Sequence, residues 1–94
     1  MNVMPAGLFE RSEALVGVRP EHLRIGGDGM PATVRVVEQL GHETLLICEA
    51  GGARVVVRQD ADATVPSPGT DVRLDAAELH RHRFDPVTER RIDQ

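Results

Sequence analysis

The side chains that could do chemistry in this 94-residue chain are few, and the histidines stand out first. His80 and His82 are two positions apart, so an extended backbone would place both rings on one face. A zinc site needs two or more further ligands. The remaining candidate ligands do not stand at ligand spacing: His22, His42, Cys48 and Asp85. We therefore expect solvent-facing histidines beside Arg81 and Arg83, and no metal site.

Nucleophiles and phosphate-binding loops are equally scarce. Ser12 and Ser67 lie in apparent loops with no histidine near them in the sequence. Cys48 lies in an apolar stretch, which favours a buried, inert thiol over a reactive thiolate. The one glycine cluster, residues 26–29, contains Asp28, whose charge would repel phosphate. A P-loop also needs a lysine, which this chain lacks. We expect no enzyme activity and no catalytic, cofactor-binding or metal-binding residue.

Composition limits the partners as well. The formal net charge is -4 and only 2% of the residues are aromatic, whereas nucleic-acid sites need basic grooves and stacking aromatic rings. We therefore expect no nucleic-acid partner. No apolar run approaches the ~20 residues of a membrane-spanning helix, and the first residues do not follow a signal-peptide pattern. These features indicate a cytoplasmic protein.

The elements that must position these side chains are mostly strands. Apolar residues alternate or cluster between proline- and glycine-containing breaks. The pattern predicts strands over residues 15–19, 32–41, 43–50, 53–59 and 70–76. Pro20 ends the first strand and begins a helical turn. The other connections are predicted to be a turn at 26–29, a hairpin turn at Gly51 and Gly52, and a loop over 60–69.

The two ends of the chain are less regular. Residues 1–14 have no clear period, so we expect a lead-in segment with room for one short strand. Residues 77–84 fit either a helical turn or a strand, and residues 85–92 fit a turn followed by a short closing strand. A spacing of about ten residues between five or six strands favours a small antiparallel barrel or sandwich.

Two of the predicted strands also make a prediction about faces. Strict alternation puts Val34 and Val36 on one face of the 32–41 strand and Val37 on the other. The 43–50 strand is apolar on both faces, so one face is expected to meet a second surface. From the residues alone, we expect a non-catalytic interaction domain, with a small-anion sensor as the alternative.

Five stretches resemble, in order, those of one protein family. They are "MNVMPA" (1–6), "VGVRPEHLRI" (16–25), "VRVVEQLGHETLLIC" (34–48), "PGTDVRL" (68–74) and "HRFDPVTERRI" (82–92). They resemble the C-terminal TOBE domain, an OB-like regulatory domain of ATP-binding subunits of bacterial sugar ABC importers of the maltose type. There are two departures. Glu89 stands where the family usually has glycine, and only about ten residues separate the first two stretches, where the family usually has further strands.

The resemblance implies an all-β fold, a small antiparallel five- to six-stranded OB-like barrel with one short helical turn. It implies that residues 1–14 lead in from an ATPase domain that this sequence lacks, and that residues 15–94 are the TOBE domain. No cofactor is implied for this chain, since ATP and Mg²⁺ belong to that ATPase domain. The positions carried over have structural or interface roles: Arg19, Pro20, Glu21, His22, Glu38, Gly41, Glu43, Phe84 and Asp85.

The implied function is regulation and dimer support in a carbohydrate importer. The implied partners are a second ATP-binding subunit, the membrane subunits through the parent protein, and a regulatory protein. The location is cytoplasmic, peripheral to the inner membrane. The alternative is a small-oxyanion (molybdate-like) binding domain, whose sites use backbone amides, hydroxyls and basic groups. The available hydroxyls do not cluster in the sequence: Thr33, Thr44, Ser67 and Thr70.

Overall fold

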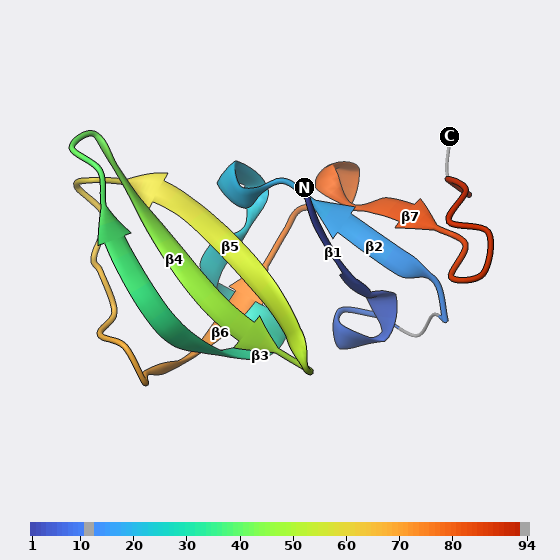
Figure 1. Ribbon diagram of the computed structural model, residues 1–94, viewed down its shortest axis with the longest axis horizontal. Helices are drawn as coiled ribbons and strands as arrows, with labels where there is room; N and C mark the ends of the chain where they lie inside the picture. The colour runs from blue at the N-terminus through green and yellow to red at the C-terminus, as the bar shows by residue number, and fades with distance from the viewer. Residues whose placement is uncertain (11–12, 93–94) are drawn as a thin grey trace.

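The chain is all β in the computed structural model, which describes residues 1–10 and 13–92. Seven strands form two antiparallel sheets, ordered β1-β2-β7 and β5-β4-β3-β6 (Figure 1). The strands are β1 (Asn2–Pro5), β2 (Leu15–Val18), β3 (Arg24–Gln39), β4 (Glu43–Ala50), β5 (Ala53–Asp60), β6 (Asp71–Asp75) and β7 (His82–Phe84). The predicted all-β antiparallel, OB-like class is confirmed, with seven strands where five or six were expected.

In the described part of the chain, three short 3₁₀ helices lie between strands: η1 (Ala6–Leu8), η2 (Pro20–His22) and η3 (Glu78–His80). The second is the predicted helical turn, with Pro20 at its first position. In chain order, η2 joins β2 to β3 and η3 joins β6 to β7, so each lies on a connection between the two sheets. Among the described residues, no helix reaches the length and hydropathy that crossing a membrane would require.

The β4–β5 hairpin follows the sequence prediction closely. β4 has the predicted bounds, and Ala50 pairs with Ala53 across the two-residue turn. Gly51 and Gly52 have φ values of 54° and 82°. Two successive positive φ angles match the twist of a tight hairpin and favour glycine at both positions. The register of the β4–β5 hairpin therefore follows from the two glycines of its turn.

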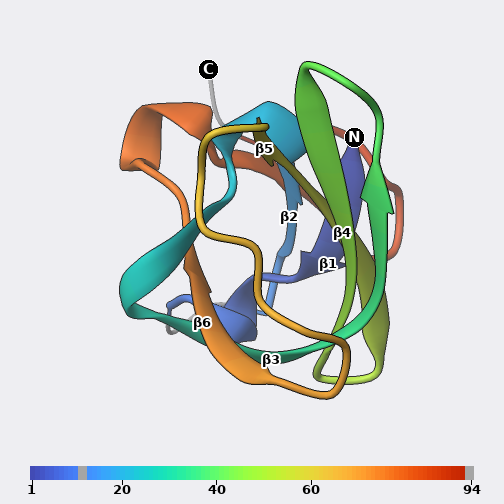
Figure 2. The same cartoon turned by 90° about the vertical axis from the view of Figure 1, so that its left-hand side faces the viewer.

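The predicted turn at residues 26–29 is wrong, because one long strand, β3, runs through this segment. Ile25 and Met30 both pair with Leu74, so the residues between them bulge out and return to the same point on β6. A Cβ on Gly29 would lie 1.9 Å from the Leu74 carbonyl oxygen. The glycines permit the bulge and this close approach. Figure 2 shows β3 curving so that β6 lies beside its first part and β4 beside its second.

The predicted faces of the 32–41 strand are also wrong beyond Val34. The register of β3 against β4 shifts between Val34 and Val36, which leaves Arg35 as an extra residue. An extra residue reverses the alternation that follows it. Val34 is therefore fully buried, Val36 is 45% exposed, and Val37 packs against the core instead.

The first residues of the chain belong to the packed structure. Met4 and Ala6 are buried in a core shared with residues of both sheets. The Asn2 amide acts as a short strand partner at the edge of β5, because its Nδ2 donates to the Val56 carbonyl (2.7 Å) and its Oδ1 accepts from the Val56 amide (2.8 Å). This pair of hydrogen bonds joins the two sheets. The division of the chain at residue 14 stays a prediction.

The last part of the chain contains both elements that the sequence left open. Residues 77–84 form η3 and then β7, and the closing strand is a single bridge between Phe84 and Arg91. The turn between them depends on Asp85, whose Oδ1 accepts hydrogen bonds from two backbone amides further along the turn. Glu89 adopts φ 60°, a left-handed conformation that glycine tolerates best. This is the position where the resembled family has glycine.

Candidate functional site

The Arg-Pro-Glu-His stretch forms a corner between the two sheets. Arg19 is extended, Pro20 begins η2, and the His22 amide closes the turn by donating to the Arg19 carbonyl (2.9 Å). Leu23, directly after the turn, is 2% exposed and anchors the corner in the core. Pro20 suits this position because its fixed φ favours the start of a helical turn and its missing amide hydrogen is not needed there.

Glu21 and Glu43 come together beside this corner, although 22 positions separate them. Both border a hollow of about 690 Å³ between η2, the ends of β4 and β5, and the following loop. The pKa of the Glu21 carboxyl is lowered, first by a hydrogen bond from its own backbone amide and then by nearby charges that include Arg58. Arg58 also pairs with Glu43 at 3.1 Å. The loop after β5 crosses the open side of the curved sheet in Figure 2, and Ala63, Thr64 and Pro66 of this loop line the hollow.

This hollow does not suit a small oxyanion. Its charged lining consists of Glu21, Arg24, Glu43, Arg58 and Asp60, so carboxylates outnumber arginines. A hydroxyl reaches it from a single lining residue, Thr64. An oxyanion site needs converging donors and a favourable charge, and the lining offers neither.

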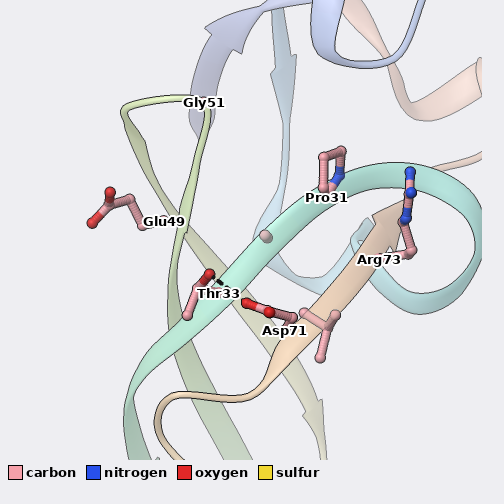
Figure 3. A pocket seen from close by; sticks show the side chains of 8 residues that line it. Pro31, Thr33, Glu49, Gly51, Asp71 and Arg73 are labelled. Carbon is pink, nitrogen blue, oxygen red and sulfur yellow. Dashed lines mark hydrogen bonds between the residues drawn. The ribbon is translucent and has the colours of Figure 1, made fainter.

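A second hollow, of about 570 Å³, lies beside β3 and β6 (Figure 3). Thr33 donates a hydrogen bond to the Asp71 carboxylate (2.9 Å), and the Glu49 side chain lies on the opposite side of Thr33 from Asp71. Arg73 instead donates to the Gly29 carbonyl (3.1 Å). Thr44 is buried in β4, so these hydroxyls and basic groups do not converge on one point.

The other predicted positions serve separate parts of the fold. Glu38 is exposed on β3 opposite Leu45, and Gly41 has φ 78° in the turn between β3 and β4. Phe84 lies over Gly17, where an added Cβ would stand 3.0 Å from the ring. The predicted residues therefore fall into two groups. One group lies at the corner and around the neighbouring β3–β4 turn, and the other lies in β7 and the turn after it. Their structural or interface roles stay predictions.

The histidines are arranged differently from the expectation. The backbone is not extended at His80, so its ring does not share a face with His82. It stacks on the His22 ring, with ring centres 3.6 Å apart and planes inclined by 16°. Among residues 1–10 and 13–92, no three histidine, cysteine, aspartate or glutamate side chains gather as a metal site would require. No local pattern predicts this stack, because 58 positions separate the two residues.

Cys48 is buried, and burial raises the pKa of its thiol. A thiol in this state is a poor nucleophile because the thiolate is the reactive form. This agrees with the expectation of an inert cysteine. Cys48 faces the core. The residues directly before and after it in β4 face the opposite, outer side of the sheet.

The outer face of the four-stranded sheet carries an apolar strip that sequence reasoning found only in part. Val36, Ile47 and Val56 form a row across β3, β4 and β5 by their register, and Leu45 follows Ile47 along the same face of β4. We call these four residues the outer strip. Ile47, Val56 and Leu45 are half-buried and Val36 is 45% exposed. The doubly apolar pattern of residues 43–50 pointed to this face, but the β3 bulge that brings Val36 to it was missed.

Comparison with known proteins agrees with this fold. The sequence profile of a family described as the TOBE domain matches residues 16–84. The chain belongs to the TOBE domain family. The matched range runs from β2 to the end of β7 and includes the Arg-Pro-Glu-His corner and all four residues of the outer strip. The resemblance drawn from the sequence is therefore confirmed.

Relatives of this TOBE domain are ATP-binding proteins of ABC transporters. An uncharacterised ABC transporter ATP-binding protein of Sinorhizobium fredii is 45% identical over 85 residues, covering 90% of this chain and 23% of the relative. An sn-glycerol-3-phosphate import ATP-binding protein of Ralstonia nicotianae is 40% identical over 93 residues, covering 96% and 25%. A sulfoquinovosyl glycerol transport ATP-binding protein of Agrobacterium fabrum is 36% identical over 87 residues, covering 89% and 24%. The chain spans about a quarter of the length of these relatives.

Proposed function

We propose that this TOBE domain is the regulatory part of the ATP-binding subunit of a carbohydrate or polyol importer, and that it supports the pairing of two such subunits. The named relatives transport sn-glycerol-3-phosphate and sulfoquinovosyl glycerol, which motivates this class of cargo. We infer that ATP and Mg²⁺ bind in another part of the subunit, because the relatives are ATP-binding proteins of which this chain spans about a quarter, and this chain has no lysine for a P-loop. The subunit acts at the cytoplasmic side of the inner membrane with membrane subunits and a regulatory protein.

The observation that carries the pairing part of this proposal is the outer strip. Four aliphatic side chains occupy the middle of an open sheet face, and ion pairs border them on both sides. Arg35 pairs with Glu49 at 3.5 Å beyond one end, and Arg58 pairs with Glu43 at 3.1 Å beyond the other. An apolar centre with a polar, solvated rim is typical of protein interfaces.

The charges at the two ends of the outer strip favour a second copy as the partner. One end carries two arginines and one glutamate, and the other carries three carboxylates and one arginine. The first group is Arg35, Glu49 and Arg54, and the second is Glu38, Glu43, Arg58 and Asp60. A two-fold axis through the strip would set the net positive end of one copy against the net negative end of its mate. Such an isologous contact is the commonest way in which identical subunits pair.

Sedimentation equilibrium of the chain tests the proposal. We expect self-association with a Kd of about 1 mM or below. The variant Val36→Glu puts a charge into the strip at an exposed position, and we expect it to raise that Kd at least ~10-fold. Val87→Glu is the matched control, because Val87 is 89% exposed and lies outside the strip. A chain that stays monomeric at about 1 mM, or that associates equally well as Val36→Glu, would contradict the proposal.

A further inference from the structure

The stacked pair of His22 and His80 has no part in the proposed pairing surface. His22 ends η2 and His80 ends η3, and these two turns lie on the two connections that cross between the sheets (Figure 1). The near-parallel rings, 3.6 Å apart, therefore bring one connection into contact with the other. The stack lies beside two other links between the sheets, the shared core and the Asn2–Val56 hydrogen bonds.

The surroundings of the stack favour neutral rings. His22 Nδ1 is buried and has no hydrogen-bond partner. Both ring nitrogens of a protonated histidine are donors, so protonation of His22 would leave a charged donor without an acceptor. Burial lowers the pKa of His80 from its ordinary value of 6.5, and the neighbouring His22, His82 and Arg24 lower it further. Arg24 belongs to β3 and His82 to β7, so the groups beyond His22 that oppose a charge on His80 come from two elements.

The carboxylates near the stack already have other partners. Asp75, which lines the same hollow as both rings, accepts from Arg81 at 3.2 Å. Glu78 on η3 accepts from Arg83 at 2.6 Å. Glu21 on η2 accepts a hydrogen bond from its own backbone amide. Because these three carboxylates already have partners, they are not counter-ions to a protonated His22 or His80 ring.

We propose that the His22–His80 stack is an acid-sensitive joint, which holds the two sheets together while the rings are neutral and loosens when both become charged. Two stacked imidazolium rings repel each other, whereas neutral aromatic rings attract. Because the ring of His80 gives up its proton more readily in the folded chain than in the unfolded chain, the stabilisation is complete above about pH 6.5 and declines as the pH falls below that value.

Urea unfolding followed by far-UV circular dichroism at about pH 7.5 and about pH 5.5 tests this joint. We expect the urea midpoint of the chain to fall between the two values. His80→Phe keeps a flat ring but cannot take a proton, so it should lose more than half of that fall. His42→Gln is the control, because His42 is an exposed histidine in the β3–β4 turn and its removal should leave the fall unchanged. An unchanged fall in His80→Phe would overturn the proposal.

A second measurement needs no substitution at the stack. In an NMR titration of the unaltered chain, the His80 ring should titrate below its ordinary pKa of 6.5. Titration of His80 at or above that value would overturn the proposal even if His80→Phe failed to fold. Glu10 and Asp85 do not interfere, because their pKa values are lowered from 4.5 and 3.8 and therefore lie below this window.

Discussion

The two sheets differ in whether their surface side chains have partners within the domain. Beside the three-stranded sheet, Arg83 donates to both oxygens of Glu10 at 2.7 and 2.6 Å, and the Arg81 guanidinium lies 4.8 Å from the centre of the Phe9 ring. These side chains bind one another and tie η1 to the last strand. On the four-stranded sheet, Val36 is 45% exposed at one end of the apolar row that continues through Ile47 to Val56.

This difference separates side chains that stabilise the fold from side chains that are available to a partner. A cluster of arginines and carboxylates is a common candidate for a binding site. The Glu10–Arg83 cluster, however, forms its hydrogen bonds within the domain and leaves little for a partner to bind. An apolar strip at the centre of an open face gains most when it is covered, since burial of apolar surface stabilises by ~25 cal/mol per Å². We therefore propose the four-stranded sheet as the interaction surface and propose that the charged cluster contributes to stability.

Breaking the charged cluster should give the largest effect on stability. Arg83→Met removes a two-pronged hydrogen bond and leaves Glu10 without this partner, so we expect the free energy of unfolding to fall by about 2 kcal/mol. Arg35→Met is the matched change on the other sheet, where the Arg35–Glu49 pair is 55% exposed on both sides. It should cost less than about 0.5 kcal/mol. Urea unfolding at neutral pH measures both.

Acid should remove the difference between Arg83→Met and the unaltered chain. The Arg83 hydrogen bond lowers the pKa of Glu10 from 4.5. The stabilisation is therefore present above pH 4.5 and is lost as the pH falls through the lowered value. Equal costs for Arg83→Met and Arg35→Met at neutral pH would mean that the two sheets do not differ in the way described.

A smaller and opposite effect is expected in the turn after β7. Glu89→Gly should raise the free energy of unfolding by about 1 kcal/mol, because Glu89 adopts φ 60° and glycine takes this conformation without a steric cost. Thermal or urea unfolding of the variant measures the gain. A loss of stability in Glu89→Gly would show that the Glu89 side chain contributes more to the turn than its backbone conformation costs.

The sequence predicted the features that depend on neighbours along the chain. The bounds of β4, the turn at Gly51 and Gly52, and the corner at Pro20 all follow from local patterns. The two irregularities of β3 do not, because each arises from pairing with a distant strand, at Leu74 in one case and Cys48 in the other.

The side-chain clusters escaped prediction for a related reason. The Glu10–Arg83 hydrogen bonds join residues 73 positions apart, and the His22–His80 stack has no spacing that a pattern could reveal. The outer strip was half visible, since Leu45 and Ile47 made β4 apolar on both faces. Val36, the residue of the outer strip on β3, was assigned to the wrong face because the bulge at Arg35 reverses the alternation.

The most direct test of the outer strip as the pairing surface is the amide NMR spectrum of the chain at about 50 µM and at about 1 mM, concentrations on either side of a weak association. The account predicts concentration-dependent shifts at Val36, Leu45, Ile47 and Val56 and unchanged signals in β7. Shifts confined to the three-stranded sheet, or a spectrum that does not change with concentration, would contradict it.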